Sequence, residues 1–77
     1  MKKYILKWGE GLISRIQKVY KTMEVEAENM DALNPLVILP EELREKIEYV
    51  RTIICSDTRR SYDYGSWSEF IEAEELK

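Results

Sequence analysis

The side chains that could act as nucleophiles are five serines and one cysteine, Cys55, in a chain that has no histidine. A serine or cysteine nucleophile needs a neighbouring base to take its proton, and histidine usually fills that role. Ser66 is better explained as a helix N-cap, because Glu69 follows it at the spacing of a capping box. Zinc would need three ligands besides Cys55, and no Asp and Gly spacing resembles a calcium loop. We therefore expect a protein that is not an enzyme and that has no cofactor and no metal site.

The single cysteine also bears on the compartment in which the protein works. With only Cys55 present, an intramolecular disulfide is excluded and no oxidising compartment is needed. Because Cys55 follows Ile53 and Ile54, we expect a partly buried structural thiol. The N-terminus begins like a signal peptide, but Lys7 interrupts its apolar stretch, and the run Leu36–Leu39 is too short to span a bilayer. We expect a cytoplasmic protein without membrane contact.

Charged side chains are the next candidates, and they occur in blocks although the formal net charge is only −3. Residues 23–42 contain several acidic side chains and no basic ones. A face formed by these acids could dock onto a basic protein surface. The simpler interpretation is a solvated acidic face. The acids selected as candidates for partner binding are Glu24, Glu26, Glu28 and Asp31.

The first 22 residues are basic, and their side chains could instead meet the phosphates of a nucleic acid. These residues are Lys2, Lys3, Lys7, Arg15, Lys18 and Lys21. The negative net charge and the lack of a Gly-rich phosphate loop argue against this use. Pairing of the basic block with the acidic block inside the molecule is equally natural.

A third candidate region, residues 59–70, combines the residue types that are enriched in interface hot spots with adaptable Ser and Gly. Its proposed contact residues are Arg59, Arg60, Tyr62, Tyr64 and Trp67. The alternative is that these aromatic rings close over the core of a small domain.

The elements that must position these side chains are predicted from hydrophobic periodicity. Alternating Tyr4, Leu6 and Trp8 favour a short strand or arm over residues 1–9. Apolar residues at helical spacing predict a helix over 10–33, which could break near 22–25, where period-two alternation would suit a strand. Helices are also expected over 40–55 and 66–76, separated by a loop at 56–65.

The 77 residues therefore predict a single small domain that is mainly α, with two to three helices and a short N-terminal strand as an option, and with α+β as the alternative fold class. The favoured function is a non-catalytic protein-binding module, an inhibitor or adaptor of a basic partner such as a nucleic-acid-processing protein. Small inhibitors encoded by phages and mobile elements act in this way, and the comparison with them is an analogy only. The alternatives are a nucleic-acid-binding regulator, for which a homodimer is an option, and a structural subunit of a larger assembly.

Overall fold

The computed structural model describes residues 1–12, 15–48 and 50–76, and these form one five-stranded antiparallel sheet. The strands are β1 (Lys2–Leu12), β2 (Arg15–Ala27), β3 (Arg51–Ser56), β4 (Arg59–Asp63) and β5 (Glu69–Leu76). Their order across the sheet is β2-β1-β5-β4-β3. Two short 3-10 turns (Met30–Ala32 and Pro35–Ile38) and the six-residue helix α1 (Glu41–Lys46) lie between β2 and β3.

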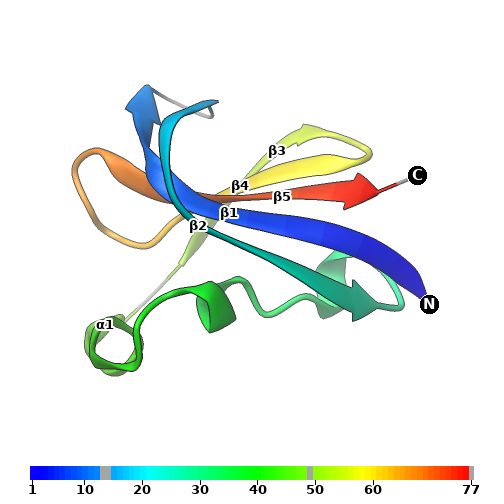
Figure 1. Ribbon diagram of the computed structural model, residues 1–77, viewed down its shortest axis with the longest axis horizontal. Helices are drawn as coiled ribbons and strands as arrows, with labels where there is room; N and C mark the ends of the chain where they lie inside the picture. The colour runs from blue at the N-terminus through cyan, green and yellow to red at the C-terminus, as the bar shows by residue number, and fades with distance from the viewer. Residues whose placement is uncertain (13–14, 49, 77) are drawn as a thin grey trace.

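Two hairpins, β1–β2 and β3–β4, are joined by the last strand, β5, which enters between them and pairs with β1 on one side and β4 on the other. The connection between β2 and β3, with α1, lies below the sheet in Figure 1, and the end of β1 bends towards the opposite side. The sheet therefore has one covered face and one open face.

The hydrophobic core lies between the covered face and this connection. Tyr4 and Leu6 of β1 and Ile71 and Ala73 of β5 alternate with residues of the open face, as expected for strands with one face on a core. The connection adds further side chains, of which Met30, Ile38 and Leu39 are buried. Asn29 and Asn34 accept hydrogen bonds from the backbone N–H groups of Ala32 and Leu36, and these bonds stabilise the two 3-10 turns.

The mainly α fold class is wrong, and helix α1 alone does not make the fold α+β. The largest error is the helix expected over residues 10–33, because the described part of this range belongs mostly to β1 and β2. The alternative prediction near residues 22–28, in which period-two alternation suits a strand, agrees with the end of β2. Residues 13–14 of the expected helix lie outside the described residues.

The two later helices were also predicted wrongly. Of the helix expected over 40–55, only Glu41–Lys46 is helical, and β-branched residues beyond it form β3. Residue 49 lies outside the described residues. The helix expected over 66–76 is β5, and the loop expected over 56–65 contains all of β4. The strand expected over residues 1–9 is present as β1, which extends farther, to Leu12.

No helix of the described residues is long and apolar enough to cross a membrane.

The hairpin β1–β2 is bent at two irregularities in its register, between Trp8 and Gly9 and between Glu10 and Gly11. Bulges of this kind increase the local twist and bend of a strand pair. At Gly9 the partner backbone comes so close that a Cβ atom would overlap the carbonyl oxygen of Lys18. The bend therefore depends on the absence of a side chain at this position.

We expect Gly9→Ala to lower the free energy of unfolding by about 2–3 kcal/mol, because the added methyl group forces the two backbones apart. Urea denaturation followed by circular dichroism measures the change. Gly65→Ala is the control. Gly65 has a positive φ of 94° but open space around its missing Cβ, so only the cost of the left-handed backbone, about 1 kcal/mol, should appear. Equal losses for the two variants would contradict the close approach at Gly9.

Candidate functional site

The open face of the sheet holds a trough formed by two neighbouring hollows. One hollow lies between the end of β1, the start of β3 and the end of β4, and apolar groups make up most of its lining. The other hollow lies farther along β5 and is lined mainly by charged groups. Ser61 of the first hollow is opposite Glu72 of the second in the β4–β5 register, so the two hollows adjoin on one face. We refer to the pair as the open-face trough.

The apolar hollow has a volume of about 280 Å³. Phe70 forms its buried floor, and Leu12, Ile53 and Trp67 lie around it. The side chain of Trp67 is fully exposed to solvent, and Leu12 is 70% exposed. Polar groups complete the lining, among them Arg51 and Asp63, which form an ion pair at 3.4 Å. The hollow thus offers an apolar recess beside a freely accessible indole ring.

The charged hollow has a volume of about 290 Å³ and is lined by three cations and two carboxylates together with Ile16 and Val19. The charged residues are Lys7, Arg15, Arg59, Glu72 and Glu74. Glu72 is only 8% exposed, which for a carboxylate requires a partner. Arg59 supplies this partner through an ion pair of 3.5 Å.

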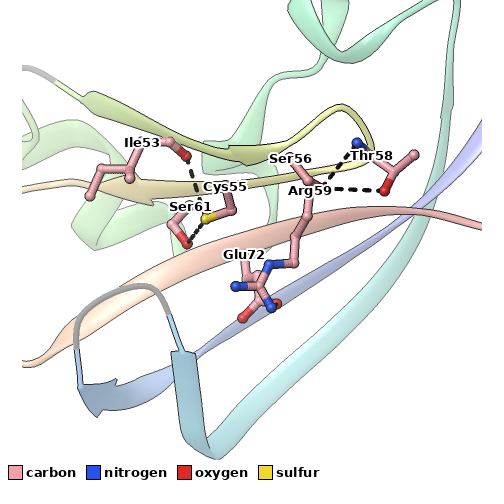
Figure 2. A network of polar contacts seen from close by, with 7 residues as sticks. All are labelled: Ile53, Cys55, Ser56, Thr58, Arg59, Ser61 and Glu72. Carbon is pink, nitrogen blue, oxygen red and sulfur yellow. Dashed lines mark hydrogen bonds and ion pairs between the residues drawn. The ribbon is translucent and has the colours of Figure 1, made fainter.

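Cys55 lies beside Ser61, which lines the apolar hollow, and Arg59 of the charged hollow lies in the same network of polar contacts (Figure 2). The Sγ atom of Cys55 lies 3.7 Å from the Oγ atom of Ser61 and 3.9 Å from the carbonyl oxygen of Ile53. The Cys55 side chain, followed by Glu72, raises the pKa of Arg59 above its ordinary value. Although a partly buried thiol was expected, Cys55 is exposed, because β3 lies at the edge of the sheet.

A cluster of aromatic rings and carboxylates lies where the β1–β2 hairpin bends. The indole N–H of Trp8 donates to the hydroxyl of Tyr64 at 2.8 Å, and that hydroxyl donates to Glu69 at 3.0 Å. The ring of Tyr20 packs edge-on against Trp8 with centroids 5.3 Å apart. Its hydrogen bond to Glu10, which lies opposite Glu69 in the register, raises the pKa of Tyr20 to about 12. Burial raises the pKa of Tyr64 as well, and Glu69 adds to this effect.

The structure separates the five residues predicted for contact in the segment 59–70. Tyr62 is buried in the core, and its hydroxyl has no hydrogen-bond partner among the described residues. Arg60 bonds to Asp31 at 2.6 Å on the covered face, and Tyr64 is held by Trp8 and Glu69. Arg59 lines the charged hollow. Trp67 alone of the five is fully exposed.

The predicted acids are divided in a similar way. Glu24 and Glu26 alternate along β2 and are exposed on the open face, opposite Ile5 and Lys3 of β1. Glu28 is exposed just beyond the strand, and Asp31 is occupied by Arg60. The acidic and basic blocks meet in this hairpin where Lys3 lies opposite Glu26.

The predicted basic residues do not share one surface. Lys3 and Lys7 lie on the open face, whereas Lys2 and Lys21 are in register with residues of the covered face. Lys2 forms an ion pair with Glu75 at 3.9 Å, and the Lys18 ammonium lies 5.8 Å from the Tyr20 ring centre. Arg15 lines the charged hollow.

Sequence reasoning missed the apolar partners of Trp67 in the trough, Leu12, Ile53 and Phe70. Leu12 and Phe70 were assigned to the inner faces of helices, so their side chains were expected in a core. The consecutive β-branched residues Thr52, Ile53 and Ile54 were the available signal for β3 and hence for Ile53. Within the described residues, no group of three or more Cys, Asp or Glu side chains could hold a metal ion.

Comparison of the chain with protein-family models, with curated proteins and with solved structures gives no match. Function is therefore inferred from the geometry of the trough and its surroundings.

The two tyrosines of the segment allow a matched test of this geometry. We expect Tyr64→Phe to lower the free energy of unfolding by about 1–2 kcal/mol, because Trp8 and Glu69 both lose their partner. Tyr62→Phe removes a hydroxyl without a partner and should change stability by no more than about 0.5 kcal/mol. Thermal and urea denaturation of both variants measure the difference. A larger loss for Tyr62→Phe than for Tyr64→Phe would show that the polar contacts are assigned wrongly.

The raised pKa of Tyr20 gives a second test. We expect Glu10→Gln to shift this pKa from about 12 towards 10, since the hydrogen bond to the Glu10 carboxylate is the largest cause and the charge of Glu10 adds to it; the effect of burial stays in the variant. The phenol stays protonated in the folded state at pH values where the unfolded chain ionises. Its contribution to stability is thus complete below pH 10 and is lost as the pH rises through about 12. Tyrosinate absorbance, with Tyr20→Phe subtracted to isolate the signal, measures the shift. Glu26→Gln, on the open face, should leave it unchanged.

Proposed function

We propose that the chain is a non-catalytic protein-binding module, a small inhibitor or adaptor that receives a segment of a partner protein in the open-face trough. The observation that carries this proposal is the fully exposed indole of Trp67 beside an apolar hollow. Trp is the residue type most enriched in interface hot spots, where it packs into the partner and loses its water. Leu12 and Ile53 extend the apolar surface around the ring.

The charges around the trough indicate the chemistry of the partner. Glu24 and Glu26 are exposed on the same face as the trough, at the edge strand β2, and Glu28 continues this acidic border. A partner with basic side chains next to an apolar anchor would match both features. A nucleic-acid-processing protein is one such partner, since the groove that it uses for phosphates is basic; this remains an analogy. We place the module in the cytoplasm, where its exposed Cys55 would stay reduced.

A nucleic-acid-binding regulator is the less favoured function. Phosphate recognition requires basic side chains clustered on one surface. Of the six basic residues considered, Lys3 and Lys7 lie on the open face, and Lys2 and Lys21 lie towards the covered face.

The test is affinity capture from a lysate of the source organism with immobilised protein, at low and at moderately high salt. We expect one protein to be retained by the wild-type chain and lost on Trp67→Ala. The matched control, Glu45→Ala, changes an exposed residue of α1 on the covered side and should retain it. Because Trp67 is fully exposed, its replacement should change the free energy of unfolding by less than about 0.5 kcal/mol.

A second variant, Glu24→Lys with Glu26→Lys, tests the acidic border. It should weaken capture of the same protein, most strongly at low salt, where exposed charges are least screened. Equal capture by wild type and Trp67→Ala would contradict the proposed docking site. Recovery of nucleic acid alone, or of proteins that nuclease treatment releases, would contradict the function.

A further inference from the structure

The two edges of the sheet differ in how they are protected against pairing with another strand. The edge strand β2 carries the exposed charges Lys18, Lys21, Glu24 and Glu26 and is bent by the irregularities in its pairing with β1. Charges and bulges are the usual means by which natural sheets avoid edge-to-edge contact. The other edge, β3, has a single charged residue, Arg51, at its first position, and one irregularity in its pairing with β4, between Ile54 and Ser56.

Strand β3 is also accessible along its length. All of its residues are exposed except Ile53, which is half-buried. Ile54 is 70% exposed, so this edge presents a large aliphatic side chain to a strand that pairs with it. Among the described strands, β4 is the only one that pairs with β3, so its outer N–H and C=O groups lie free of the sheet.

The sequence of this edge is chemically symmetric about Ile54. It reads Arg51-Thr52-Ile53-Ile54-Cys55-Ser56-Asp57. If two copies pair antiparallel with Ile54 opposite Ile54, Arg51 lies opposite Asp57, the first residue of the turn after β3, at both ends, in addition to its ion pair with Asp63 of its own chain. The hydroxyl residues Thr52 and Ser56 then oppose each other, and Ile53 opposes Cys55.

We propose that β3 is a self-pairing edge, through which a second copy of this chain adds antiparallel to form a continuous ten-stranded sheet about a two-fold axis. Self-complementarity is what a two-fold interface requires, because the same patch must serve both subunits. Opposite charges at both ends fix the register, and the pair of Ile54 side chains gives an apolar contact at the centre. Because each copy uses its less charged edge, and the strongly charged and bent edge β2 stays unpaired, the assembly closes as a dimer and does not extend.

The open-face trough stays accessible in this dimer. Edge pairing takes place in the plane of the sheet, whereas the trough lies on its open face. Arg51 and Ile53 of β3 line the trough, and Leu12 and Phe70 belong to β1 and β5. Such an edge buries little surface, so we expect a weak dimer with a dissociation constant on the order of 10–100 μM. Sedimentation equilibrium over a range of concentrations above and below these values measures the association.

The first test uses a matched pair of lysine substitutions. Ile54→Lys places two ammonium groups opposite each other on the two-fold axis, and we expect the dissociation constant to rise at least about tenfold. Leu12→Lys changes an equally exposed residue, also 70% accessible, on a strand outside the interface and should leave the dimer unchanged. Circular dichroism melts of both variants establish that the monomers fold.

The second test determines the register with single cysteines. In the variant Ile54→Cys with Cys55→Ser, the Cα atoms of the two introduced cysteines should be about 4.5–5.5 Å apart, within the range for a disulfide. In Thr52→Cys with Cys55→Ser, the matching atoms lie four residues apart along the strands, about 14 Å, and should not react. The native Cys55 pair is diagonal, with side chains about 7–8 Å apart, and should crosslink slowly. Mild oxidation followed by non-reducing electrophoresis gives the yields.

Dimerisation that Ile54→Lys abolishes, with rapid crosslinking at position 54 only, supports the proposal. A chain that remains monomeric at every concentration overturns it and leaves the β3 edge open to a strand of another protein. A dimer that survives Ile54→Lys, or equal crosslinking at positions 52 and 54, also overturns it. These outcomes are independent of partner capture through Trp67, so failure of one proposal does not imply failure of the other.

Discussion

The pairing of β5 with both hairpins is the interaction on which the rest of the structure depends. Each hairpin alone is a two-stranded ribbon, which is marginal in water. Entry of β5 between β1 and β4 converts the two ribbons into one sheet. The same strand supplies both faces, since Ile71 and Ala73 belong to the core and Phe70 and Glu72 form the floor of the trough. A consequence of this central position is that a carboxylate, Glu72, is buried and has to be paired by Arg59.

Much of the failure to predict the fold has a local physical cause in the β1–β2 hairpin. Period-two alternation is visible at Tyr4, Leu6 and Trp8, before the first irregularity in the register. Each extra residue at a bulge changes which face the following side chains occupy. Because the extra residues lie on β2, at Gln17 and Tyr20, the hydrophobic pattern of residues 15–21 loses its alternation and imitates the spacing of a helix. The side chains of Val19 and Tyr20 in that pattern, and of Leu12 before it, are in fact exposed.

In β5 the pattern fails for a different reason. A central strand is buried on both faces, so Phe70, Ile71, Glu72 and Ala73 are consecutive buried residues without alternation. A short apolar run of this kind does not distinguish a strand from a helix.

The candidate site could also be predicted from the sequence only in part. Composition identified residues 59–70 as a region rich in interface-type side chains, but the internal partners of Arg60, Tyr62 and Tyr64 depend on contacts with distant segments. Trp67 is exposed while these neighbouring side chains are held by internal partners, and the sequence alone does not show which of them is exposed.

The two tryptophans occupy opposite environments, and this gives the molecule a built-in pair of optical reporters. Trp8 is hydrogen-bonded and packed against another ring, whereas Trp67 is surrounded by solvent. Emission from the exposed indole is red-shifted and accessible to soluble quenchers, and emission from the packed indole is less so. Fluorescence can therefore follow occupation of the trough and integrity of the hairpin separately, in one sample and without an added label.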